Sequence, residues 1–368
     1  MLYLHIPYCH RKCTYCAFYS IVTTGDKQAY VDALCLELKR RSHCMEGPIR
    51  TVYFGGGTPT VLTVPQLAQV VESIRSHYDV SALEEVTIEA NPEDLTTDYL
   101  SDLRQLAFFD RISIGVQSFR DADLCTLNRR HTSQQALEAV ENAATAGFKN
   151  LSIDLIYGLP NQTVDDWLGN LSRLESLPIN HLSAYALTVE EGTMLYQQIG
   201  QGKVKVCDED VQLSHYQSLL RWAEDHGFHQ YEISNFARQG HRAVHNSRYW
   251  NRTPYLGVGA AAHSFDGSRR RWNVADVQRY ISSVQSGPID HEDEEISLKD
   301  AHNEYLMTAL RTVEGVEKRL VAQPFADRLM HSMQRFVAEG LILDTPTHYR
   351  PTPEGLLLAD GIAADLFV

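Results

Sequence analysis

The sequence predicts an α/β protein made of an open, partial (βα)6 barrel and a small C-terminal domain. Six strand-like runs alternate with six helical patterns over roughly the first two thirds of the 368 residues. Repeated βα units form a parallel sheet with right-handed crossovers, and six units are too few to close the usual eight-stranded barrel. An open doubly wound sheet is the alternative.

The elements follow from short β-branched or aromatic runs and from the periodicity of the segments between them. Strands are predicted at 2–6, 51–54, 86–89, 111–115, 151–156 and 181–184. Helices are predicted at 27–41, 65–77, 97–106, 133–147, 164–174 and 208–227. Gly147 and Gly227 stand where helices commonly end in a glycine. We assign residues 1–285 to the barrel domain.

An acidic linker is predicted over 286–297, because SGPIDHEDEE contains Gly and Pro and a run of charge. Residues 298–368 are predicted to form a winged-helix-like domain. Helices are expected at 298–313 and 325–339, then a strand-turn-strand in LILDTPTHYRPTP, then a helix from Glu354. From Asp290 onward there are 15 acidic residues against 7 Lys and Arg, and the whole chain carries −14. This charge argues against binding to nucleic acid.

The N-terminal region and the hydropathy predict a cytoplasmic protein. No apolar run approaches the roughly 18 residues of a membrane span. The sequence begins without a signal-peptide pattern before the first motif.

Three of the seven cysteines, Cys9, Cys13 and Cys16, form the pattern CxxxCxxC directly after the first strand. In a βα barrel the carboxyl end of the strands carries the active site. Three thiolates can hold three irons of a [4Fe–4S] cluster and leave the fourth iron open. A structural zinc site normally uses four protein ligands, and zinc or coincidence remain the alternatives. The other four cysteines are scattered, so a disulfide framework is not indicated.

Polar and glycine residues also follow several of the predicted strands. FGGGTPT ends the second strand, and such glycines let backbone N–H groups approach a ligand closely. Glu89, Gln117 and Asp154 lie at or near the ends of the next strands. Each alone is explained equally well as a solvated or structurally paired residue. Their shared placement at one end of the sheet favours a single binding site.

The order of these motifs, as far as about Phe265, resembles the radical S-adenosylmethionine (SAM) superfamily. LYLHIPYCHRKCTYC, FGGGTPT, GVQSF, RRHT and IDLIYGLP are most similar to the oxygen-independent coproporphyrinogen III oxidase family. The resemblance implies a barrel of the radical SAM type and a [4Fe–4S] cluster held by the three cysteines. It also implies that the cluster takes electrons from a donor and that SAM chelates its open iron. The implied SAM-binding residues are Tyr3, Tyr15, Gly56, Gly57, Thr58, Glu89, Gln117, Arg129, Asp154 and Ala186.

This family has two branches, a porphyrinogen dehydrogenase and a heme chaperone, and three features favour the chaperone. The dehydrogenase has a further cysteine where this sequence has Phe18, and an extension before the first strand, whereas this sequence starts two residues before Tyr3. His245-Asn-Ser-Arg-Tyr-Trp250 matches the HNxxYW motif of the chaperone branch. The resemblance implies heme as ligand and acceptor hemoproteins as partners, membrane-bound respiratory proteins among them, and is compatible with a homodimer. The dehydrogenase is the alternative.

The residues around this motif also suit a planar, anionic ligand. The stretch is basic and aromatic within an acidic protein, and it contains Arg238, His241, Arg242, His245, Arg248, Tyr249, Trp250 and Arg252. An imidazole can ligate heme iron, arginines suit propionates, and aromatic faces suit a macrocycle. We predict heme contact at His245, with His241 or a cysteine as rival ligands. The alternative is that His245 and Asn246 shape a loop while the arginines form salt bridges.

Overall fold

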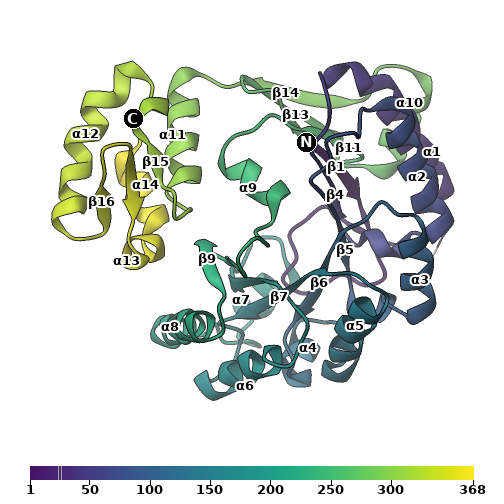
Figure 1. The fold of residues 1–368 in the computed structure, drawn as a ribbon. Coiled ribbons are helices and arrows are strands. Elements are labelled where there is room, and N and C mark those ends of the chain that lie inside the picture. Colours follow the sequence, from purple (N-terminus) through teal and green to yellow (C-terminus); the bar gives the residue numbers. More distant parts are fainter. Residues whose placement is uncertain (24, 26) are drawn as a thin grey trace.

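A curved sheet surrounded by helices dominates the computed structural model, which describes residues 1–23, 25 and 27–368 (Figure 1). Within these residues, nine strands form the sheet in the order β11-β1-β4-β5-β6-β7-β8-β10-β9. The parallel strands are β1 (Leu2–Ile6), β4 (Thr51–Gly56), β5 (Glu85–Ala90), β6 (Arg111–Gln117), β7 (Asn150–Tyr157), β8 (His181–Ala186) and β11 (Leu256–Val258). The antiparallel strands β10 (Asn235–Ala237) and β9 (His229–Glu232) extend the other edge.

The six predicted βα units are confirmed. From β1 to β8 the parallel strands follow one another in chain order, whereas a doubly wound sheet reverses its order. The helices of this part are α1 (Gln28–Arg41), α2 (Val64–His77), α3 (Thr97–Gln105), α4 (Asp121–Thr126), α5 (Ser133–Thr145), α6 (Val164–Leu174), α7 (Met194–Gly200) and α8 (Glu209–Asp225). A short parallel pair, β2 (Tyr8–Cys9) and β3 (Ile21–Val22), follows β1.

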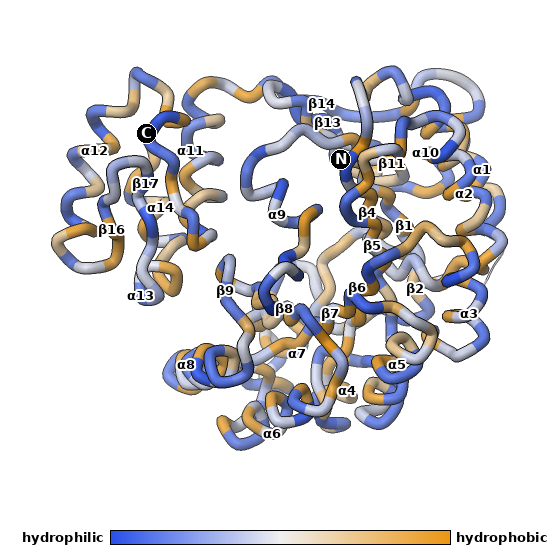
Figure 2. Tube along the Cα trace, viewed as in Figure 1, coloured by the Kyte–Doolittle hydropathy of each residue, from blue (hydrophilic) through white to orange (hydrophobic). Residues whose placement is uncertain are grey.

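Local sequence explains where these helices begin and end. Thr63, Thr132 and Thr163 each cap a helix in a reciprocal capping box with the residue three positions later. Gly147 and Gly227 adopt φ values of +92° and +72°, as the predicted helix ends require. In Figure 2, α6 and α8 alternate between hydrophobic and hydrophilic residues, as expected for helices with one buried face.

The two faces of the parallel strands differ sharply in polarity. Side chains such as Leu4, Phe54 and Ile88 belong to the hydrophobic core between the sheet and the helices. The alternate positions face the barrel axis and are polar. They include Tyr3, His5, Thr51, Tyr53, Glu85, Thr87, Glu89, Arg111, Ser113, Ser152, Asp154, His181 and Ser183. We call this set the lumen; barrels of this kind more often fill it with branched apolar residues.

The predicted acidic linker is wrong for residues 291–295. They form β14 (His291–Glu295), which pairs antiparallel with β13 (Arg269–Asn273), itself paired with β12 (His263–Phe265). Arg269 and Arg270 form ion pairs with Glu295 and Glu294 on the facing strand. The acidic run is therefore ordered by a basic run earlier in the chain, since opposite charges across a ladder are favourable. The helix α10 (Val277–Ser286) connects the two strands.

The C-terminal domain has the predicted order of helix, helix, hairpin and helix. It comprises α11 (Leu298–Ala309), β15 (Val316–Glu317), α12 (Gln323–Ala338), β16 (Ile342–Asp344), β17 (His348–Pro351), α13 (Pro353–Leu357) and α14 (Ala359–Leu366). Its hydrophobic core is separate from that of the barrel domain. The two domains are joined by the backbone bridge between Glu232 and Thr312 and by Glu304, which pairs with Arg252 and Arg270. Ile233 of the barrel domain also packs against the C-terminal core. Among the described residues, no helix is both long and apolar enough to cross a membrane.

Candidate functional site

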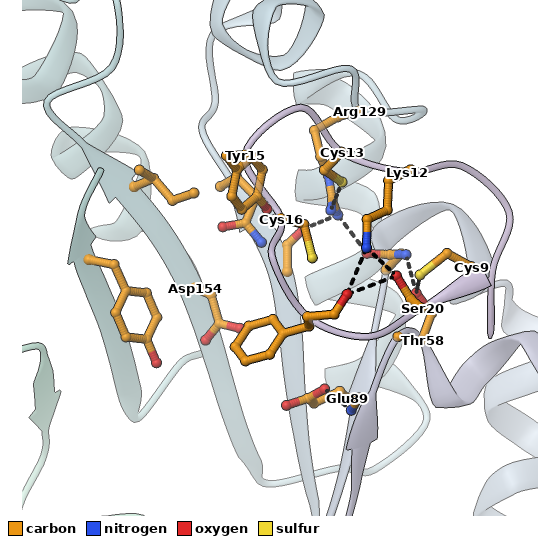
Figure 3. Close-up of a pocket in the computed structure, with 18 of the residues that line it drawn as sticks. Cys9, Lys12, Cys13, Tyr15, Cys16, Ser20, Thr58, Glu89, Arg129 and Asp154 are labelled. Carbon is orange, nitrogen blue, oxygen red and sulfur yellow. Dashed lines mark hydrogen bonds between the residues drawn. The ribbon is translucent and has the colours of Figure 1, made fainter. Parts of the chain in front are cut away.

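A cavity of about 440 Å³ lies at the carboxyl ends of the parallel strands, and we call it the cysteine cavity (Figure 3). All three predicted cluster ligands, Cys9, Cys13 and Cys16, line it. Nine of the ten residues implied to bind SAM line it as well: Tyr15, Gly56, Gly57, Thr58, Glu89, Gln117, Arg129, Asp154 and Ala186. The remaining one, Tyr3, and the predicted heme ligand His245 do not belong to its lining.

The loop that carries the cysteines is anchored at several points. The backbone of Thr14 donates to the carbonyl of Leu127 at 3.1 Å and accepts from the backbone of Leu195 at 2.8 Å. The side chain of Asn128 donates to the carbonyl of Lys12 at 2.8 Å. These contacts fix the loop between the ends of α4 and α7. Within residues 1–23, 25 and 27–368, no three Cys, His, Asp or Glu side chains group closely enough to hold a single metal ion.

Donors and cations surround the three thiols. The hydroxyl of Thr58 lies 3.6 Å from the Cys9 sulfur, and the guanidinium of Arg129 donates to the Cys13 sulfur at 3.3 Å. Burial raises the pKa of the Cys9 and Cys16 thiols, and the nearby Lys12 ammonium opposes this effect at both. Such donors stabilise charge on sulfur, and hydrogen bonds to sulfur are among the factors that set cluster potentials.

Lys12 and Asn91 were not among the sequence-predicted residues, although both line the cavity. The Lys12 ammonium donates to the Phe18 carbonyl at 2.7 Å and to the Ser20 hydroxyl at 2.8 Å (Figure 3). Asn91 links two predicted residues, since it donates to Thr58 at 3.0 Å and accepts from Arg129 at 2.6 Å. Two features of the sequence could have indicated these residues. Asn91 directly follows a strand, and Lys12 lies inside the cysteine motif.

Two carboxylates face the cavity from β5 and β7 (Figure 3). Glu89 accepts from the Tyr53 hydroxyl at 2.7 Å and from the backbone N–H of Gly56 at 3.2 Å. Burial raises the pKa of Glu89 to about 7, although the hydrogen bond from Tyr53 opposes the effect. Asp154 accepts from the Ser113 hydroxyl at 3.2 Å, and burial raises its pKa too. Together they offer acceptors for an ammonium group or for hydroxyls.

Gly57 has no room for a side chain, which leads to a prediction. Its N–H donates to the Ile6 carbonyl at 2.8 Å, and a Cβ atom there would lie 2.6 Å from the Tyr8 carbonyl oxygen. We expect Gly57→Ala to push the glycine segment away from the start of the cysteine loop and to destabilise the protein by about 1–3 kcal/mol. Urea unfolding measures the loss. Gly169→Ala, with open space around the Cβ position, is the control and should not destabilise the protein; equal losses would contradict the packing argument.

Tyr3 lies in the lumen because it is the second residue of β1, close to the amino end of the strand, whereas the cavity is at the carboxyl ends. Its hydroxyl is hydrogen bonded to His5 at 3.0 Å, and its ring stacks on Tyr53 with centroids 6.2 Å apart. Since Tyr53 donates to Glu89, Tyr3 supports a residue of the cavity without lining it.

The structure does not support heme ligation by His245. The helix α9 (Val244–Trp250) packs at the amino ends of β4 and β5, whereas the cysteine cavity is at their carboxyl ends. His245 is 0% exposed, and its two ring nitrogens are hydrogen bonded to Thr51 at 2.9 Å and to Tyr249 at 3.0 Å. The N–H groups of Val244 and His245 donate to the carboxylate of Glu85. A heme iron would have to displace these bonds.

The arginines around His245 are also engaged in the fold, as the alternative interpretation holds. Their partners are glutamates far away in the sequence: Arg242 pairs with Glu314, Arg248 with Glu84, and Arg252 with Glu304. Trp250 lies beside the guanidinium of Arg311, 5.8 Å from ring centroid to Cζ. His241 has no place in the cavity lining either.

Comparison with known proteins assigns the chain to a family. Residues 3–174 match the Radical SAM superfamily and residues 296–358 match the HemN C-terminal domain. The "Heme chaperone HemW" of Bacillus subtilis is 33% identical over 98% of this chain and 97% of its own length. The chain belongs to the HemW family. The HemW protein of Lactococcus lactis is also 33% identical, over 92% of this chain and 87% of its own.

Among solved structures, coproporphyrinogen III oxidase (HemN) from Escherichia coli, described as a radical SAM enzyme, superposes with a TM-score of 0.85. It is 25% identical, and the match covers 100% of this chain and 89% of that one. The predicted fold class, a radical SAM α/β fold followed by a C-terminal domain, is therefore confirmed for this member of the HemW family.

Proposed function

We propose that this protein binds a [4Fe–4S] cluster and SAM in the cysteine cavity, and that it binds heme and delivers it to acceptor hemoproteins. The observation that carries the cofactor part is the convergence of three thiols, two carboxylates and a glycine edge on one cavity. These donors fit a [4Fe–4S] cluster with one open iron. Three thiolates would bind three irons, and no fourth cysteine of the described residues lines the cavity to bind the remaining iron.

Different residues of the cavity are proposed to bind the cluster and the different groups of SAM. Cys9, Cys13 and Cys16 hold the cluster, which when reduced by a donor supplies single electrons. Gly56 and Gly57 form the glycine edge of the cavity, and such backbone N–H groups suit a carboxylate. Glu89 and Asp154 suit the SAM ammonium and ribose hydroxyls. The remaining members of the proposed SAM site are Tyr15, Gly56, Gly57, Thr58, Gln117, Arg129 and Ala186, with Tyr3 behind them.

Gln117 is held in an unusual conformation at this site. Its φ of +67° lies in the left-handed region, which is costly for a residue with a side chain. The β-bulge between Gly115 and Gln117 accompanies this conformation. Strain at a cavity wall supports a role in binding, because such conformations persist where the surrounding structure fixes a side chain for use.

The heme chaperone proposal is favoured over the porphyrinogen dehydrogenase by Phe18. This residue occupies the place of the dehydrogenase's further cysteine, lines the cysteine cavity and is 73% exposed. Relatives matched over nearly the full chain are named heme chaperones. We include in the proposal a cytoplasmic location, an electron donor to the cluster, pairing with a second copy, and membrane-bound respiratory proteins among the acceptors.

One experiment separates the two functions. The protein is reconstituted anaerobically with iron and sulfide, then titrated with hemin and, in parallel, incubated with coproporphyrinogen III, SAM and a reductant. We expect a saturable Soret change, heme transfer to an apo-hemoprotein, and no conversion of the porphyrinogen. Absence of a spectral change together with porphyrinogen turnover would establish the dehydrogenase instead.

A further inference from the structure

Arg111, at the start of β6, is a buried arginine, and two of the three nitrogens of its guanidinium lack a hydrogen-bond partner among the residues that the structure describes. It is 1% exposed, and neither its Nε nor its Nη1 has a hydrogen-bond acceptor within the described residues. Its Cα partner on β5 is Thr87, whose buried hydroxyl also lacks a partner in that part of the chain. A buried guanidinium with N–H groups that lack acceptors is costly, and nearby negative charges are the means of offsetting this cost.

The strand alternation places Arg111 in the lumen directly beneath the two cavity carboxylates. Ser113, the next lumen residue on β6, donates to Asp154. Glu89 is the next lumen residue after Thr87 on β5. Two residues along a strand span about 7 Å, so Arg111 lies one such step below Glu89. It lies one step below Ser113 as well, and Ser113 reaches the Asp154 carboxylate, although Asp154 itself pairs with Gly115. At that distance, and shielded from water, a positive charge acts strongly on a buried carboxylate.

The groups that face these carboxylates are mostly neutral or negative. Tyr53, Tyr3, Tyr185 and Tyr249 surround Glu89, and the two carboxylates repel each other. Burial raises the pKa of Asp154, and two cations, Arg111 and Arg129, oppose this effect. Arg111 has the larger influence of the two. Arg129 is already engaged with Cys13, Asn91 and the Gly115 carbonyl. Arg111 is therefore the cation best able to offset the negative charge of the pair.

We propose that Arg111 is a positioning residue for SAM, which favours the ionised forms of Asp154 and Glu89 so that both can accept hydrogen bonds from the ligand. This inference rests on the proposed function, because it assumes that SAM occupies the cysteine cavity. Arg111 is not among the residues that line the cysteine cavity. It acts through the charge state of the two residues that do face the ligand.

The test measures SAM affinity against pH in anaerobically reconstituted protein. Arg111→Gln removes the charge, Arg111→Lys keeps it, and Thr87→Val is a matched control in the same lumen layer. Affinity is expressed as the ratio of variant to wild type, which cancels the titration of the SAM amino group itself. We expect Arg111→Gln to bind about tenfold more weakly at pH 7 and to approach the wild type by about pH 9. The Lys and Val variants should follow the wild-type profile.

The other outcomes are also decisive. Equal affinity of Arg111→Gln and wild type at all pH values would overturn the inference. So would a loss that is independent of pH and shared by Arg111→Lys, since that would indicate packing alone. Failure of the wild type to bind SAM would contradict the proposed function and not the role of Arg111. Cluster content and thermal unfolding are recorded for each variant, and Arg111→Met replaces the Gln variant if that one does not assemble.

Discussion

Replacing Cys9, Cys13 or Cys16 by serine is expected to abolish the cluster. Each variant should fall from about four irons per chain to less than about one tenth of that value, lose its acid-labile sulfide, and turn colourless. The reason is that the three thiols that line the cavity are the proposed cluster ligands, and two thiolates alone would not hold the cube. Iron and sulfide analysis after anaerobic reconstitution, with the visible spectrum, gives the measurement. SAM binding should disappear with the cluster.

Two cysteines outside the cavity are matched controls for this experiment. Cys44 is exposed in the short 3-10 helix that follows α1, and Cys207 precedes α8. Neither cysteine lines the cysteine cavity. Cys44→Ser and Cys207→Ser should keep full iron and sulfide. Full iron content in a serine variant of Cys9, Cys13 or Cys16 would refute the assignment of that residue as a ligand.

Replacing His245 by alanine should destabilise the barrel domain by about 3–5 kcal/mol. The change leaves a void at a fully buried site and removes the partners of Thr51 and Tyr249, and both effects are costly. The barrel's transition in urea unfolding measures the loss. His241→Ala is the control; because its side chain is not fully buried, we expect a change within about 0.5 kcal/mol.

The pH dependence of this effect identifies its cause. Burial lowers the pKa of His245 to about 3, well below the 6.5 of an unfolded chain. The unfolded wild type therefore takes up a proton that the folded wild type excludes, and the wild type loses stability as the pH falls from about 6.5 towards 3. The deficit of His245→Ala should be largest above pH 6.5 and should shrink below it. A deficit that does not depend on pH would contradict the burial of a neutral imidazole.

The same variant decides whether His245 ligates heme. If its role is structural, folded His245→Ala should give the same Soret change with hemin as the wild type. Loss of the Soret change in a variant that remains folded would restore His245 as the axial ligand, despite its burial at the opposite end of the strands.

Local sequence carried most of the information about the barrel. The βα alternation predicts each parallel strand from β1 to β8, because strand runs, capping threonines and terminal glycines are all short-range signals. β14 could not be predicted in this way. Its acidic run is a strand only because Arg269 and Arg270 lie opposite, and such pairing depends on the folded chain.

The residues of the cavity could be predicted where they stand at the ends of predicted strands. Glu89, Gln117 and Asp154 gather there because parallel strands end on one side of the sheet. The role of His245 could not be derived from its neighbours in sequence. Its partners Thr51 and Glu85 begin two distant strands, and only the fold brings them to α9.

The separation of the two hydrophobic cores has a consequence for measurements on the whole chain. Within the part of the chain that the structure describes, the core of the C-terminal domain shares no buried side chain with that of the barrel. The two domains meet through the Glu304 ion pairs, the backbone bridge between Glu232 and Thr312, and the side chain of Ile233, which packs against the C-terminal core. Domains with separate cores favour separate transitions, so we expect calorimetry to resolve two endotherms. Added salt should move them further apart by weakening the Glu304 ion pairs, and no single midpoint temperature will then describe the molecule.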